Sequence, residues 1–212
     1  TDHPELRVMV REEDPMQSMP LVVRGDFDMA VVQDWNNEPL PLPDGLHKGV
    51  ICEDVADVAL PADHPLAGRD AIDLKELAGD PWISSSPDSI CCDWLRRTLR
   101  AVDSEPRIEH MVYEFASQLA LVAAGFGNVI LPRLGRCDVP PGVAIVPLAD
   151  PLSRRVYAVW REEAARRPAI RAVVTALRAA APAGETGDRA DDRTGDRVGD
   201  RVGVPVRVPA RS

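Results

Sequence analysis

The chain has 212 residues, of which 45% are apolar and 4% aromatic, so its length and composition predict one large or two small globular domains with aliphatic cores. The net charge is −9, and residues 183–212 hold six acids and six arginines, so the whole acidic excess lies in residues 1–182. A surface that acidic repels phosphate backbones, which makes this part of the chain a poor direct reader of DNA.

The first third of the chain predicts a strand, a helix and a second strand. Residues 6–10 alternate apolar and polar side chains, residues 16–24 favour a short helix, and residues 27–32 form an apolar run after Gly25. This order implies two parallel strands joined by a crossover helix, as in α/β folds. Residues 35–45 are rich in proline and predict a loop, and residues 50–60 predict further extended chain.

The middle of the chain predicts another alternation of strands and helices. Residues 73–78 favour a short helix with Asp73 as its cap, and residues 82–83 a strand. The sequence Ser86-Pro87-Asp88 is typical of a helix start, with Ser86 as the N-cap. The expected helix covers residues 88–102, and its apolar stripe consists of Trp94, Leu95, Leu99 and Val102. A strand is expected over residues 108–112.

Residues 114–133 predict a helix, a glycine stop and a short buried strand closed by Pro132. Gly125 suits the left-handed conformation that ends a helix. A dinucleotide fingerprint has the reverse order, in which glycines follow a strand and precede a helix. Gly125 and Gly127 therefore do not predict a cofactor site, and we expect no cofactor.

The last third predicts two strands, a helix and a tail. The strands are expected over residues 143–146 and 155–160, and the helix over residues 168–181. The sequence Thr-Gly-Asp-Arg occurs at 186–189 and again at 194–197, in a segment with few apolar residues. This composition predicts a disordered low-complexity tail over residues 183–212.

The cysteines and the chain start bear on the compartment. Cys52, Cys91, Cys92 and Cys137 lack the spacing of a zinc site, so we expect no metal site and thiols in a reducing, cytoplasmic compartment. No apolar run is long enough to span a bilayer, and we expect no membrane contact. The chain begins with Thr1 and an acidic segment that is not a signal peptide, so we expect a fragment whose N-terminal part is missing.

Three serines, Ser84, Ser85 and Ser86, follow the strand expected at 82–83 and precede a helix. Free backbone N–H groups and the helix dipole favour an anion at such a position, and hydroxyl groups add donors. These serines are candidate contacts for a ligand carboxylate. The alternative is that Ser86 caps the helix while the other two face solvent.

Two further groups of residues follow expected strands and are candidate ligand contacts. Gln33 and Asp34, next to Trp35, follow the strand expected at 27–32, and α/β sheets bind ligands beyond such strand ends. A surface loop is the alternative. The second group follows the strand at 108–112 and comprises Tyr113, Glu114 and Phe115. Glu114 has the alternative role of a helix-start acid, and Phe115 that of a core anchor.

Four segments, in this order, resemble one family. Residues 24–31 are similar to its strand motif Gly-x-x-Asp-(Ile/Leu/Met)-Ala-(Ile/Leu), and residues 60–67 to its Pro-x-x-His-Pro-Leu-Ala turn. Residues 74–83 resemble its Leu-x-x-Leu-Ala-x-x-Pro-Trp-Ile segment, and residues 121–132 its Leu-Val-Ala-Ala-Gly-x-Gly segment. The family is the LysR-type transcriptional regulators, and the resemblance covers their effector-binding domain over roughly residues 3–180.

The resemblance implies an α/β fold of two Rossmann-like lobes joined by two crossover strands, similar to type 2 periplasmic binding proteins. Lobe one would comprise residues 1–51 plus 151–182, and lobe two residues 52–150. A small-molecule effector, with carboxylates among the candidates, would bind in the cleft between the lobes. The N-terminal winged helix-turn-helix of the family is not found, nor are the strand and helix that normally open the effector-binding domain.

The resemblance also implies partners. DNA would be bound only through the missing N-terminal domain. The full-length protein would form a homo-oligomer, since helix 88–102 and strand 107–112 resemble the family's dimerisation surface. The partner helix of that surface is not found, so we expect weakened or altered dimerisation of this chain.

Two other classes of function stay open on the sequence. A transporter's solute-binding protein has the same two-lobe architecture but needs an export signal. An enzyme would have to use His64 or His110, yet neither has a second ligand or an orienting residue at recognisable spacing. We therefore expect no catalytic residues.

Overall fold

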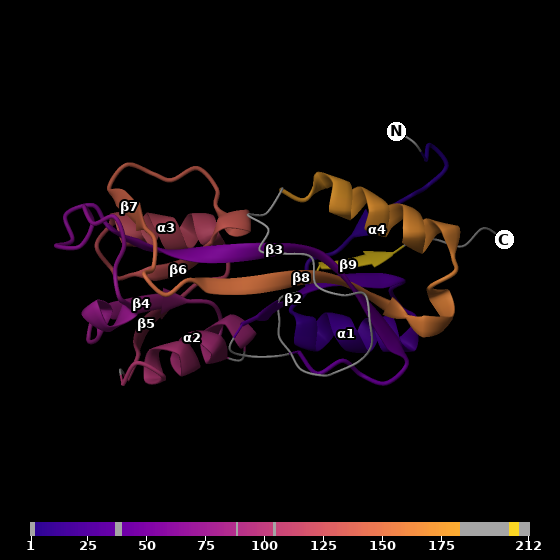
Figure 1. Cartoon of the computed structure of the whole chain (residues 1–212), viewed down its shortest axis with the longest axis horizontal. Coiled ribbons are helices and arrows are strands. Elements are labelled where there is room, and N and C mark those ends of the chain that lie inside the picture. Colours follow the sequence, from indigo (N-terminus) through magenta and orange to yellow (C-terminus); the bar gives the residue numbers. More distant parts are fainter. Residues whose placement is uncertain (1–2, 37–39, 88, 104, 183–203, 208–212) are drawn as a thin grey trace. The chain divides into compact units, whose positions relative to one another are not determined.

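The structure is a computed structural model that describes residues 3–36, 40–87, 89–103, 105–182 and 204–207. The chain divides into two compact units, the first formed by Thr1–Glu53 with Arg154–Ser212 and the second by Asp54–Ser153. The chain passes from the first unit to the second along strand β3 (Leu46–Pro61) and returns along β8 (Leu152–Arg161), as Figure 1 shows.

The first unit is a sheet covered by a helix on each face (Figure 1). Its strand order is β1 (Met9–Val10), β9 (Val204–Arg207), β2 (Met29–Trp35), β8 and β3. All seven residues of β2 pair antiparallel with β8.

The two helices of the first unit pack on opposite faces of this sheet because the strand side chains alternate. Helix α1 (Pro15–Arg24) packs Met19 and Val22 against one face, with Ala30, Val32, Tyr157 and Val159. Helix α4 (Pro168–Ala180) packs against the other face, with Met29, Ala158 and Trp160, and the turn η3 (Glu162–Ala164) precedes it.

Helix α1 begins and ends as the sequence chemistry dictates. The Asp14 carboxylate accepts a hydrogen bond from the backbone N–H of Met16 at 2.9 Å, and Pro15 occupies the first helical turn. At the other end Gly25 adopts a φ of 83° and donates its N–H to the carbonyl of Val22.

Three expectations for the first unit need correction. The strand expected at 6–10 is confined to Met9–Val10. The strands before and after α1 are not neighbours, because β9 lies between them and pairs antiparallel with both. Residues 204–207 thus form a strand inside the tail that was expected to be disordered, since an unpaired edge of β2 offers them ladder partners. The remaining tail, 183–203 and 208–212, lies outside the described residues.

The second unit contains antiparallel and parallel pairs. The C-terminal part of β3, from Ala56 to Pro61, pairs antiparallel with β6 (Val129–Pro132) and with β7 (Val143–Val146). Strand β4 (Pro81–Ser84) pairs in parallel with β5 (Arg107–Met111). Helices α2 (Ile90–Arg100) and α3 (Phe115–Ala123) belong to this unit, and so do the turns η1 (Leu74–Leu77) and η2 (Arg133–Gly135).

The helix–glycine–strand segment forms as predicted, with α3 followed by β6. Gly125 adopts a φ of 78° and donates its N–H to the carbonyl of Val122, which ends the helix. Gly127 has a φ of 142°, and a Cβ there would lie 2.6 Å from the carbonyl oxygen of Pro81. Both glycines therefore serve the backbone path into β6.

Two helices of this unit differ from the sequence prediction, one in its type and one in its start. Asp73 caps as expected and forms a capping box with Glu76, but the helix that it opens is a 3₁₀ turn. Helix α2 begins at Ile90 with Ser89 as its N-cap, so the expectation that Ser86 caps it is wrong. The physical reason is that the Ser89 hydroxyl accepts the N–H of Cys92.

Within the described residues no helix has the length and apolar composition that crossing a membrane requires. The four cysteines are in the thiol form.

Candidate functional site

The carboxyl end of β2 holds a buried polar group in the first unit. Gln33 is 6% exposed, and its side-chain oxygen accepts a hydrogen bond from the guanidinium of Arg154 on β8. The same guanidinium lies over the ring of Trp35, 5.5 Å from its centroid. Strand pairing produces this arrangement, because Trp35 lies opposite Arg154 in the ladder. The amide of Gln33 is thus oriented by a cation that itself stacks on an aromatic ring.

Asp34 lies on the other face of β2 and belongs to a separate polar network. Its carboxylate is 3.6 Å from the ammonium of Lys48 and accepts a hydrogen bond from the hydroxyl of Tyr157. The ammonium in turn lies 4.3 Å from the centroid of the Tyr157 ring. Arg155, which pairs with Glu53 at 3.2 Å, adds a further positive charge near Asp34.

Burial has the largest effect on the pKa of both acidic groups in this network, Asp34 and Tyr157. It raises the pKa of Asp34 above 3.8, against the lowering effects of the Tyr157 hydrogen bond, Lys48 and Arg155. Burial, followed by the neighbouring Asp34 carboxylate, also raises the pKa of Tyr157. The Tyr157 hydroxyl therefore stays a neutral donor at ordinary pH and holds the Asp34 carboxylate in place.

In the second unit the parallel pairing of β4 with β5 brings two candidate groups to one sheet edge. Ser84 lies opposite Met111 in the ladder, and its carbonyl accepts the N–H of Val112 at 2.8 Å. The serines that follow β4 and the residues 113–115 that follow β5 therefore leave the sheet at the same end. Ser84 and Ser85 are both buried there.

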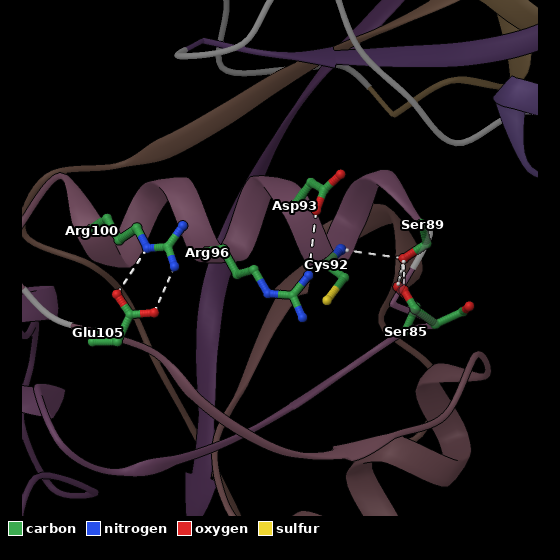
Figure 2. Close-up of polar contacts among 8 residues, drawn as sticks. Ser85, Ser89, Cys92, Asp93, Arg96, Arg100 and Glu105 are labelled. Carbon is green, nitrogen blue, oxygen red and sulfur yellow. Dashed lines mark hydrogen bonds and ion pairs between the residues drawn. The ribbon is translucent and has the colours of Figure 1, made fainter.

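A hydrogen-bond chain at the start of α2 fixes the role of Ser85 (Figure 2). The Ser89 hydroxyl donates to the carbonyl of Ser86 at 2.6 Å and accepts from the N–H of Cys92 at 3.3 Å. The hydroxyl oxygens of Ser85 and Ser89 are 2.8 Å apart. Because Ser89 has only one proton and gives it to Ser86, Ser85 must be the donor of that pair. The Ser85 oxygen is left able to accept from a ligand, but its proton is not available to a ligand carboxylate.

The exposed face of α2 carries ion pairs rather than ligand chemistry (Figure 2). Arg100 makes two hydrogen bonds to the carboxylate of Glu105, at 2.9 and 2.6 Å, and these lower the pKa of Glu105. Arg96 pairs with Asp93 at 3.4 Å, one turn apart. Both pairs are solvated and tie the helix surface together locally.

The three residues after β5 have different environments. Tyr113 is 58% exposed and Glu114 is the N-cap of α3, with no side-chain capping bond. Phe115 packs against the core of this unit and against Gly135, where a Cβ would lie 2.4 Å from its ring. Phe115 therefore takes the role of a core anchor, while Tyr113 is accessible.

The two histidines considered for catalysis have structural neighbours. The Nδ1 atom of His64 accepts the N–H of Leu66 at 3.2 Å, so its Nε2 carries the proton and donates to Asp80 at 3.1 Å. Asn128 donates to the same carboxylate oxygen at 3.0 Å, which ties the turn after β3 to the start of β6. His110 stacks edge-on against Phe126. Among the described residues no group of three or more His, Cys, Asp or Glu side chains could hold a metal ion.

Sequence reasoning missed four residues that organise these groups, namely Lys48, Ser89, Arg154 and Tyr157. Arg154 and Tyr157 lie on β8 and Lys48 lies near the start of β3. These strands follow β2 later in the chain, so only the strand register shows that their side chains contact it. Ser89 had a local signal, because it immediately precedes the apolar start of α2.

Comparison with known proteins is consistent with this architecture. The sequence model of one protein family, described as LysR substrate binding domain, matches residues 1–182. The chain is 28% identical over 174 residues to the uncharacterized HTH-type transcriptional regulator YnfL of Escherichia coli (strain K12), covering 80% of this chain and 57% of YnfL. The chain spans about half the length of the curated relatives that it matches.

Many solved structures share the fold, and two of them illustrate the likeness. The C-terminal domain of a probable LysR family transcriptional regulator from Rhodococcus sp. RHA1 is 26% identical with a TM-score of 0.64, covering 76% of this chain and 79% of that one. The effector binding domain of QuiR, solved in complex with shikimate, is 20% identical with a TM-score of 0.58 and covers 76% of this chain and 74% of its own.

Proposed function

Because the chain belongs to the LysR substrate binding domain family, we propose that it is the effector-sensing domain of a LysR-type transcriptional regulator. The observation that carries the proposal is the family match over residues 1–182, which spans every described element except β9. The effector is a small metabolite, and DNA is bound by another domain of the full-length, cytoplasmic regulator. The match favours a regulator over a transporter's solute-binding protein, and we infer no catalytic activity.

The two units of the chain are proposed as the two lobes of this domain, with lobe one over residues 1–51 plus 151–182 and lobe two over residues 52–150. The cleft between lobes that the family resemblance implies stays a prediction. An effector changes transcription only through its differential affinity for two states of the regulator, so binding and signalling are separable properties.

We propose that the effector is held by Gln33 and Asp34 of the first unit and by six residues of the second unit. These six residues are Ser84, Ser85, Ser86, Tyr113, Glu114 and Phe115. Support comes from the shared sheet edge of the two groups in the second unit and from the oriented amide of Gln33. Ser84 and Ser86 are the proposed donors to an effector carboxylate. Ser85, whose proton goes to Ser89, accepts from an effector hydroxyl.

These roles define the effector chemistry: a small carboxylate that also carries hydroxyl groups. Shikimate, the ligand of QuiR, has both features and is a suitable first probe. A thermal-shift screen should pair each hydroxy acid with its deoxy analogue and with its amide. A ligand at 100 times its Kd stabilises the folded state by about 2.7 kcal/mol, which such a screen detects easily.

Variants then test the site residues by calorimetry with the best ligand. We expect Ser84→Ala and Gln33→Ala to weaken binding at least about tenfold, since each removes a group bonded to the ligand. Ser117→Ala and Gln17→Ala are matched controls on exposed helical positions. If Ser84→Ala and Gln33→Ala bind as tightly as the controls, the proposed residues are not the effector site.

We also propose that the full-length regulator is a homo-oligomer and that α2 and β5 contribute to its interface. This chain alone is expected to dimerise weakly. Light scattering after size exclusion measures this directly, and a tight symmetric dimer of this chain would contradict the expectation.

A further inference from the structure

Three side chains lie together on one face of the first unit's sheet: Gln33 and Trp35 of β2 and Arg154 of β8. Alternation along a strand puts Gln33 and Trp35 on the same face, and the ladder places Arg154 opposite Trp35. All three residues are buried. Their polar contacts are therefore shielded from water, where hydrogen bonds are stronger and a mismatched pair of polar groups costs more.

The guanidinium of Arg154 sets the direction in which the amide of Gln33 faces. Its Nη1 atom donates a hydrogen bond to the side-chain oxygen of Gln33. A guanidinium has donors and no acceptor, so the reversed amide, with its nitrogen toward Arg154, would bring donor against donor. Hydrogen bonds from a charged donor are about twice as strong as neutral ones, so the reversed orientation is strongly disfavoured.

Arg154 is itself held in place by the ring of Trp35. The carbon of its guanidinium lies 5.5 Å from the centroid of that ring, within the range of a cation–π contact. A lysine would keep the charge but would lack the planar group that stacks on a ring and donates in a fixed direction. The position therefore favours arginine as the group that orients the amide.

We propose that Arg154 is a positioning residue of the effector site, which makes Gln33 a hydrogen-bond donor and not an acceptor toward the ligand. The amide nitrogen carries two protons, so the effector atom that meets it must be an acceptor oxygen, as in a carboxylate or a carbonyl group. An ammonium group does not fit at this point, because it can only donate. The inference rests on the proposed function and adds the ligand chemistry that the first unit selects.

Nuclear magnetic resonance of the full chain tests this preference with two small probes, acetate and methylammonium. The side-chain Nε2–H signals of Gln33 report contacts at the amide, and their absence from Gln33→Glu assigns them. We expect acetate in the millimolar range to shift these signals in a saturable way, since so small a ligand binds weakly. Methylammonium at equal ionic strength should leave them in place. A response to methylammonium, or to neither probe, overturns the proposal.

Variants of Arg154 separate positioning from general damage to the fold. Arg154→Met should weaken acetate binding at Gln33 at least about threefold, because only a fraction of the amides then faces the right way, and should let methylammonium shift the same signals. Arg154→Lys should restore part of the acetate response. Arg171→Met is the control, since Arg171 is exposed on α4 and its loss removes the same charge. If Arg154→Met responds to both probes as the native chain does, Arg154 does not position the amide.

Gln33→Glu distinguishes a failure of this inference from a failure of the proposed function. Its carboxylate keeps the shape of the side chain and pairs with Arg154, so the variant should fold, but it has lost both donors. An effector found by the thermal-shift screen should bind this variant at least about tenfold more weakly than the native chain. Equal binding would contradict the inference and leave the proposed function standing. If the screen finds no effector while acetate still acts at Gln33, the proposed function fails and the positioning role stands.

Discussion

Gly127 is the residue whose backbone the fold constrains most directly. Its φ of 142° is disfavoured for residues with a Cβ, and a Cβ would meet the Pro81 carbonyl at 2.6 Å. We predict that Gly127→Ala lowers the free energy of unfolding by about 2–4 kcal/mol, because both the strain and the contact must be relieved by moving β4 or β6. Urea denaturation followed by tryptophan fluorescence measures the change.

Gly68 is the matched control, since a Cβ there has nothing within 4 Å. Gly68→Ala should change the free energy of unfolding by less than about 0.5 kcal/mol. If Gly127→Ala leaves the free energy of unfolding unchanged, the chain leaves α3 by another path and the close approach to Pro81 is not needed.

The raised pKa of Asp34 predicts how the stability of the fold depends on pH. Burial raises its pKa above 3.8 in the folded state, so just above that pH the folded state binds more protons than the unfolded state. Stability contributed by this group is therefore lost as the pH rises through that window. Asp34→Asn does not titrate and keeps an oxygen acceptor for Tyr157, so the stability of the variant relative to the native chain should increase from about pH 4 to pH 7.

Glu53→Gln controls for the loss of one negative charge, because Glu53 is exposed and lies on β3 of the same sheet. The relative stability of this control should show a much smaller change over the same pH range. A decrease for Asp34→Asn would show that Lys48 and Arg155 stabilise the charged form more than burial disfavours it.

At the scale of an element, the start of α2 gives a prediction that separates two serines. Ser89 caps the helix and accepts the proton of Ser85, whereas Ser86 contributes its backbone carbonyl. Ser89→Ala should therefore cost about 1–2 kcal/mol of unfolding free energy, and Ser86→Ala less than about 0.5 kcal/mol. Thermal and urea unfolding of both variants provide the comparison, and equal costs would place the cap elsewhere.

The same helix start shows where local sequence reasoning ends. Ser86 and Ser89 both satisfy the preference for a hydroxyl at an N-cap, and Pro87 favours the earlier one. The choice depends on a hydrogen bond from Ser85, which the preceding strand delivers. Segment 114–133, by contrast, was predicted correctly because its apolar spacing and Gly125 act within a few residues.

Strand pairing sets the other limit on prediction from the sequence. The strand-helix-strand start was predicted, but the strand between β1 and β2 comes from residues 204–207 at the other end of the chain, which no local pattern encodes. Gln33 was a candidate because it follows the strand expected at residues 27–32, although the structure places it inside β2. Its hydrogen-bond partner Arg154 could not be predicted, because the β2–β8 ladder brings it there. The motif order predicted the fold because it sums many weak local signals over the chain.

At the scale of the whole molecule, charge governs what the chain binds. The net charge is −9, and several arginines of the second unit are engaged with acids: Arg100 with Glu105, Arg107 with Glu109, and both Arg133 and Arg136 with the buried Asp57. Neutralising DNA phosphates requires lysines and arginines that are not already compensated. We therefore predict that this chain alone forms no complex with duplex DNA at about 0.1 M salt, up to a protein concentration of about 10 µM.

An electrophoretic mobility assay with labelled duplex tests this, and a shift of the labelled DNA that weakens as salt rises would contradict it. Such a result would reveal a basic surface that the net charge conceals. The informative comparison is the same chain joined to the DNA-binding domain proposed for the full-length regulator, which should shift the duplex under identical conditions. If only the joined protein shifts the labelled DNA, DNA binding belongs to that domain and effector sensing is left to the chain described here. This outcome is expected if an acidic sensor domain acts by shifting the populations of two states and does not contact DNA itself.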